Sequence, residues 1–261
     1  MKHYILAIII ALCLSLPSYA RERYFSGVDD IQGDRESKLD TTQRKLLHES
    51  VLEYYKDPRP EKIDTLLDLM ANTEMLSRRS AKASLIGFLT VVFPNNKNHV
   101  MRWMSRNDYN VNAQEVIINS LMHAKMKESA LLFAKAHRLS GEQMLRLREM
   151  EHAVDLKNLP IILPNHVDTL WGAFFASGET IYVDQIIDAM VSNKVITKEL
   201  NDAFYLPEDA DSMSEIKSLA AMTLRDYTKE HTPVREAIER RMKAEPEASP
   251  KYELYKNILG K

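Results

Sequence analysis

Two pairs of aspartates are the residues of this chain whose spacing best suits catalysis. Asp64 and Asp68 stand four residues apart, as do Asp184 and Asp188, so each pair lies on one face of a helix. Two carboxylates with separated pKa values across a cleft could serve a hydrolase as acid and base. Like charges at this spacing repel slightly, which leaves room for a functional reason. The simpler interpretation is an ordinary acidic row on a helix surface.

Possible metal ligands gather most densely at Glu149, Glu151, His152 and Asp155. His152 and Asp155 share a helix face, as two zinc ligands on one helix must. None of the eight histidines, however, lies three or four residues from another histidine. An exposed polar helix face explains the group more simply, so we expect no metal site.

Nucleophilic and phosphate chemistry lack their usual sequence patterns. The only cysteine is Cys13, and no Gly-x-Ser-x-Gly elbow occurs. The seven glycines are scattered and form neither a P-loop nor a dinucleotide-binding pattern. A formal net charge of −2 provides no basic field for a nucleic acid backbone. We therefore expect no catalytic residue, no cofactor and no nucleic acid partner, although a site assembled from distant residues stays open.

The first twenty residues have the pattern of a secretory signal peptide. Ile5 to Leu16 is a short apolar run, and Ser18 and Ala20 put small residues where a signal peptidase reads the chain. A run of roughly a dozen residues falls short of the about 20 that span a bilayer. The sequence predicts cleavage between Ala20 and Arg21, with no transmembrane segment after processing. We expect an exported protein, in the periplasm or alternatively outside the cell.

Helical periodicity begins after a lead-in, residues 21–37, that we expect to be flexible. Few glycines and many Leu, Met, Ala, Glu and Lys favour helix over strand. Asp40 is placed to cap a helix running to Lys56, and Asp57-Pro58-Arg59-Pro60 is placed to end it. After residue 244 we expect a linker and a short capping helix within residues 245–261.

An internal repeat of pattern supports a fold of stacked helices. Residues 47–70 slide onto residues 167–190 without a gap, so that Tyr54-Tyr55 meet Phe174-Phe175 and the two aspartate pairs coincide. A single helical hairpin cannot bury its apolar face alone, so further copies must cover it. The sequence predicts an all-α, solenoid-like stack of antiparallel hairpins, similar in character to tetratricopeptide repeats. We place it in one elongated domain over residues 38–244.

Aromatic residues of the repeat divide between core and surface. We assign the inner stripe of the second hairpin to the core: Trp171, Phe174, Phe175, Val183, Ile186, Ile187 and Met190. Trp171 is expected to anchor its helix on the helix of Val183 to Met190. Tyr54, Tyr55 and Tyr182 are amphipathic and are candidates for a groove between repeats, with the core as the alternative.

Two stretches of the chain resemble motifs of uncharacterised exported bacterial α-helical proteins. One runs from Leu163 to Gly178 and contains Asp168-x-Leu170-Trp171-x-x-Phe174-Phe175-Ala176-Ser177-Gly178, with serine where that group usually has threonine. The other, from Gly87 to Trp103, is similar to an upstream block of the same group. Together they cover under a quarter of the chain. The resemblance implies an exported helical fold and supplies no catalytic residue.

These features favour a binding protein over an enzyme. Stacked helical hairpins create extended surfaces that usually bind proteins or peptides. We expect a protein- or peptide-binding module of the cell envelope, whose partner is another envelope or secreted protein. The alternatives are an extracytoplasmic hydrolase that uses paired carboxylates and a structural subunit of an envelope assembly.

Overall fold

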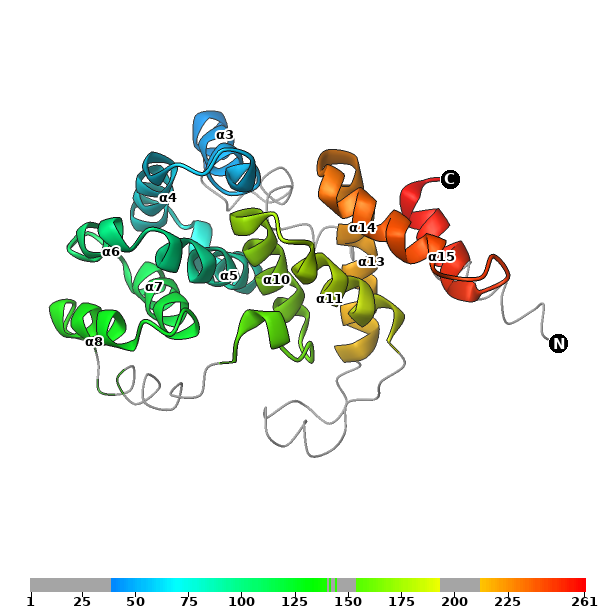
Figure 1. Ribbon diagram of the computed structural model, residues 1–261. Helices are drawn as coiled ribbons and strands as arrows, with labels where there is room; N and C mark the ends of the chain where they lie inside the picture. The colour runs from blue at the N-terminus through cyan, green and yellow to red at the C-terminus, as the bar shows by residue number, and fades with distance from the viewer. Residues whose placement is uncertain (1–38, 140, 142–143, 145–153, 193–211) are drawn as a thin grey trace.

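The computed structural model of the protein describes residues 39–139, 141, 144, 154–192 and 212–261, and its regular elements there are all helical (Figure 1). The all-α prediction is confirmed. The signal peptide 1–20, the lead-in 21–37, and Glu149, Glu151 and His152 lie outside the described residues. The α-helices are α3 (Thr41–Ser50), α4 (Pro60–Asn72), α5 (Arg79–Asn95), α6 (Lys97–Met104), α7 (Val111–His123), α8 (Lys127–Ala136), α10 (Pro164–Ser177), α11 (Thr180–Val191), α13 (Ser212–Glu230), α14 (Thr232–Lys243) and α15 (Pro250–Leu259). Short 3₁₀ turns are η2 (Tyr54–Lys56), η3 (Met75–Ser77) and η5 (Leu156–Asn158).

Consecutive helices pack against each other along much of the chain. Contacts join α3 to α4, α7 to α8, α10 to α11, α13 to α14 and α14 to α15. The turn between α10 and α11 shows how the sequence sets such a pair. Pro164 lies in the first turn of α10, and Gly178 ends the helix in the left-handed conformation with φ 71°. Because that turn is short, α11 folds straight back onto α10.

The prediction of one helix from Asp40 to Lys56 is wrong for residues 51–56. Asp40 does cap α3, with a capping box to Gln43, but the helix ends at Ser50. Val51, Leu52 and Tyr54 then bury their side chains through an irregular turn and η2. Consequently Tyr54-Tyr55 lie in a 3₁₀ turn, whereas Phe174-Phe175 lie in the last turns of α10. The two hairpins therefore differ at these positions, because tertiary packing overrides local helix propensity.

The centre of the fold is a crossing of α5 and α10, two helices far apart in the sequence (Figure 1). These helices contain the first part of the Gly87–Trp103 block and nearly all of the Leu163–Gly178 block. A Cβ atom on Gly87 would lie 1.8 Å from the carbonyl oxygen of Thr169, and one on Gly172 would lie 1.8 Å from that of Ser84. Two glycines therefore let the helix backbones touch. This long-range contact adds to the pairing of neighbours that the repeat pattern predicts.

The helix α15 lies beyond α14, on the opposite side of the molecule from α6 and α8 (Figure 1). Ser249 caps it by accepting a hydrogen bond from the backbone N–H of Lys251, and Gly260 ends it at φ 68°. Tyr255, Ile258 and Leu259 are buried against α13 and α14.

Candidate functional site

Two of the three tyrosines considered for a groove take the alternative position, in the core. Tyr54 and Tyr182 are each only 3% exposed, so they belong to the core. The Tyr54 ring meets Phe88 edge-on at 5.2 Å between centroids, and burial raises the pKa of Tyr182 to about 12. Tyr55 alone is partly exposed, and its hydroxyl lies 3.0 Å from Nδ1 of His231. For Tyr54 and Tyr182, burying the apolar ring is worth more than keeping the hydroxyl hydrated.

The inner stripe of the second hairpin lies in the core. The exposed fraction is at most 5% for every one of Trp171, Phe174, Phe175, Val183, Ile186, Ile187 and Met190. Trp171 also contacts α13, a helix that the spacing did not predict as its partner. Its Nε1–H donates to Oγ1 of Thr223 on α13 at 2.9 Å, and its ring lies 4.6 Å from that of Tyr227. The indole therefore holds α10 to α13.

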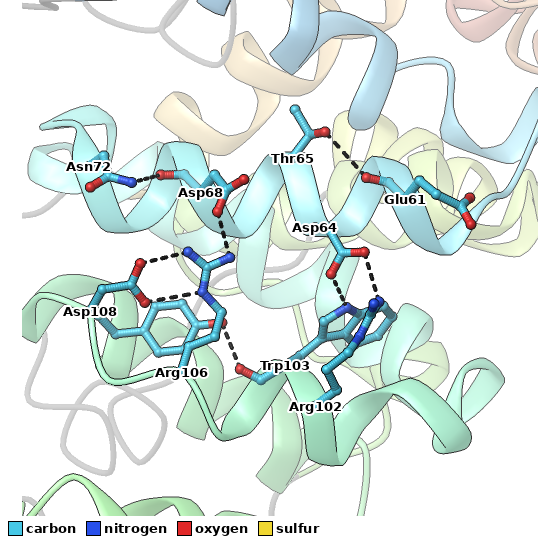
Figure 2. A network of polar contacts seen from close by, with 10 residues as sticks. Glu61, Asp64, Thr65, Asp68, Asn72, Arg102, Trp103, Arg106 and Asp108 are labelled. Carbon is cyan, nitrogen blue, oxygen red and sulfur yellow. Dashed lines mark hydrogen bonds and ion pairs between the residues drawn. The ribbon is translucent and has the colours of Figure 1, made fainter.

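The first aspartate pair on α4 is held by arginines of the chain around α6 (Figure 2). Asp64 accepts hydrogen bonds from Arg102 Nη2 at 2.7 Å and from Trp103 Nε1 at 2.8 Å. Asp68 forms an ion pair with Arg106 Nη1 at 2.6 Å. Because Arg102 and Arg106 are themselves four residues apart, they match the spacing of the two carboxylates.

Arg106 extends this network toward α7. It forms a two-pronged ion pair with Asp108 at 2.7 and 3.1 Å (Figure 2). Its guanidinium carbon lies 5.5 Å from the ring centre of Tyr109. The ion pair with Arg106 lowers the pKa of Asp108. Next in the chain, Asn110 donates to the last carbonyls of α4 and caps α7 by accepting from Ala113. The cluster thus fastens α4, α6 and α7 to one another.

The second aspartate pair on α11 is held in the same manner by α14. Asp184 accepts hydrogen bonds from Arg240 at 2.7 Å and from Arg241 Nε at 2.9 Å. Arg241 also reaches Asp188, at 3.1 Å, and so spans both carboxylates. The two pairs that coincide in the repeat therefore do the same structural work. All four carboxylates keep some exposure at the helix surface, as the simpler interpretation expects, and each is paired with an arginine.

Among the described acidic residues, Asp168 is the one whose pKa the protein raises most. Surrounding protein raises the pKa of its carboxyl group to about 8, although the residue keeps partial solvent exposure. It lies on α10, in the motif that contains Trp171. A carboxyl group that holds its proton near neutral pH is the kind that a general acid requires. No hydrogen bond to a described residue positions it.

Histidines near the start of α10 make backbone contacts. His123 Nδ1 lies 3.3 Å from the carbonyl oxygen of Val154, and His166 Nδ1 lies 2.9 Å from that of Pro160. Burial lowers the pKa of both imidazoles. Asp155, from the predicted ligand group, instead accepts from the backbone N–H of Lys157 at the start of η5. Within the described part of the chain, no three potential ligands gather around a common point.

Large apolar side chains are exposed on three successive helices. The exposed fraction is 59% for Met101 on α6, 65% for Val111 on α7, and 40% and 54% for Leu131 and Leu132 on α8. These helices lie together at one side of the molecule, where His137 at the end of α8 contacts the carbonyl of Met104 (Figure 1). The other large apolar side chains that are exposed in the described residues are Leu46, Val154 and Ile181. The apolar periodicity of a sequence places a residue on one face of a helix, but it does not show which helix faces remain exposed to solvent in the fold.

Comparison with protein families, with curated proteins and with solved structures finds no match to this chain. None of the described helices has the length and apolar character needed to cross a membrane.

Proposed function

We propose that the protein is an exported helical module that binds another protein or a peptide in the cell envelope. The observation that carries the proposal is the set of exposed apolar side chains on α6, α7 and α8, defined here as the α6–α8 surface: Met101, Val111, Leu131 and Leu132. Large exposed apolar side chains on neighbouring helices are candidates for an interaction site, because such groups are otherwise more often buried. Flexible methionine and branched aliphatic side chains adapt to the apolar face of a bound chain.

The aspartate pairs favour this function over the hydrolase alternative. General acid–base catalysis needs one carboxyl group that can give up a proton and a second that can take one. Asp64, Asp68, Asp184 and Asp188 instead each form a hydrogen bond or ion pair with an arginine of the same chain.

Asp168 is the one observation that favours a hydrolase. Its raised pKa suits a proton donor, but a general acid also needs a second carboxylate opposite it. A structural subunit of an envelope assembly, the other alternative, would use the α6–α8 surface as well. It differs from the proposed function in the permanence of the partner.

Affinity capture with matched surface variants tests the proposal. The mature protein, a Met101→Ser/Val111→Ser/Leu132→Ser variant and an Ile181→Ser variant would each be immobilised and exposed to the native envelope fraction. Ile181 is a suitable control because it is an exposed aliphatic residue on α11, 43% exposed. A partner retained by the parent and by Ile181→Ser, but lost by the triple variant, supports the proposal. Equal capture by all three variants contradicts it, and turnover of peptidoglycan that Asp168→Asn abolishes would favour the hydrolase.

A further inference from the structure

His231 occupies the corner between α13 and α14. It is 2% exposed and precedes the first residue of α14. Its backbone N–H donates to the carbonyl of Tyr227 at 2.8 Å, and its own carbonyl accepts from Val234 at 3.0 Å. The residue therefore belongs to the end of one helix and the start of the next.

The imidazole of His231 lies in a cage of aromatic rings. The centroids of Tyr55, Phe174, Phe175 and Tyr227 lie between 5.3 and 5.8 Å from that of the imidazole. Nδ1 shares a hydrogen bond of 3.0 Å with the Tyr55 hydroxyl. Nε2 is buried and has no hydrogen-bond partner among the described residues. One ring nitrogen thus connects α14 to η2, while the other faces apolar surroundings.

The charged groups around the cage act in both directions on the imidazole: Lys56 and His48 oppose a positive charge, whereas Glu53 favours it. His48 faces it from α3, and Lys56 and Glu53 face it from η2 and the residue before that turn. The rings that α10 contributes carry no charge, α13 adds the Tyr227 phenol, and the Arg235 guanidinium of α14 donates to the Thr228 carbonyl. Burial first, and then Lys56 and His48, lower the pKa of His231 to about 4.

We propose that this corner is a pH-sensitive latch, in which protonation of His231 releases η2 from the corner of α13 and α14. A protonated imidazole carries two N–H donors, and the cage offers an acceptor to only one of them. Water can reach the other donor once Tyr55 moves, because Tyr55 is the partly exposed member of the cage. The Tyr55 ring packs against Gly178: a Cβ atom added to Gly178 would lie 2.8 Å from Cδ2 of Tyr55. The latch is independent of what the α6–α8 surface binds.

Hydrogen exchange of the full mature chain, expressed as protection relative to the intrinsic rate at each pH, tests the latch. Between pH 7.5 and pH 5, protection of residues 53–57 and 227–235 falls about thirty-fold, as the difference between pKa values of 6.5 and about 4 requires. Protection of α7 stays constant, because α7 lies outside the cage. A fall of equal size in every helix, or no fall at the corner, would overturn the proposal.

Three variants separate the latch from a general acid effect. His231→Asn removes the titrating ring, so protection at the corner no longer depends on pH in this range. Tyr55→Phe keeps the aromatic ring at position 55 and the His231 imidazole, but it removes the hydrogen bond between them. Protection is therefore lower at both pH values, while the pH dependence remains. His137→Asn, at a partly exposed histidine, behaves like the parent. A pH response that is the same in His231→Asn and in the parent contradicts the latch. If His231→Asn does not fold, the regional pattern in the parent and in Tyr55→Phe still decides the question.

Discussion

Gly87 and Gly172 occupy complementary positions where α5 crosses α10. Each glycine lies against a backbone carbonyl of the opposite helix, Gly87 against Thr169 and Gly172 against Ser84, with room for a hydrogen atom but not for a methyl group. The crossing brings the two halves of the described chain together, because α5 also packs on α7 and α10 also packs on α11 and α13. The glycines therefore set the distance between the two groups of helices.

Gly172→Ala is expected to destabilise the protein by about 3 kcal/mol, at the upper end of overpacking costs, because the clash is with backbone. Gly141→Ala is the matched control, since nothing lies within 4 Å of a Cβ at that position. Chemical denaturation of both variants measures the difference. A free energy of unfolding for Gly172→Ala that equals or exceeds the parent value would show that the helices are not in backbone contact.

Thr223→Val tests the hydrogen bond that Trp171 donates to α13. Valine keeps the shape of threonine but leaves the buried indole N–H without its acceptor, at an expected cost of about 1–3 kcal/mol. Thr223→Ser retains the hydroxyl and is expected to cost less. Thermal or chemical unfolding compares the two variants. Equal stability of Thr223→Val and the parent would mean that the indole N–H does not depend on this hydroxyl.

Arg241→Met tests the clamp between α14 and the second aspartate pair. Methionine keeps much of the aliphatic stem but removes both ion pairs, and the expected loss is about 1 kcal/mol at low salt. The loss shrinks as ionic strength rises, because these groups are partly exposed. Arg225→Met, at an exposed arginine of α13, is the control and is expected to leave stability unchanged. A salt-independent effect of Arg241→Met would mean that the stem, and not the charge, holds α14.

Asp168→Asn tests the raised pKa of the Asp168 carboxyl group on α10. The folded protein holds the proton up to about pH 8, whereas an unfolded chain releases it near pH 4, so this group lowers stability progressively as pH rises between those values. Asparagine does not ionise, so the variant gains stability over the parent as pH rises from 5 to 8. Melting temperatures measured across that range provide the test. A difference between variant and parent that is constant with pH would contradict the raised pKa.

The helical core is the part of the structure that the sequence predicts best. Apolar spacing alone places Trp171, Phe174 and Phe175 inside, because burial follows the period of the helix. Tyr54-Tyr55 fit the same period, but their contacts with distant rings pull them into a 3₁₀ turn. Local patterns contain no information about such contacts.

The candidate sites depend on contacts that spacing could not reveal. Arg102 and Arg240 are 38 and 56 residues from the aspartates that they bind, so the acidic pairs look unpaired in the sequence. For the second aspartate pair, the adjacent arginines Arg240 and Arg241 are a sequence feature that fits the observed contacts. His231 stands alone in the sequence, and only the fold surrounds it with rings from three other elements.

Site-specific photocrosslinking in the intact envelope tests the binding proposal most directly. A photoreactive phenylalanine analogue would replace Met101 on the α6–α8 surface in one strain and Ile181 on α11 in another, both at exposed positions. The proposed function predicts a discrete crosslinked product of higher mass from position 101 and none from position 181. Absence of any product from position 101, or the same product from both positions, would contradict a partner bound at the α6–α8 surface.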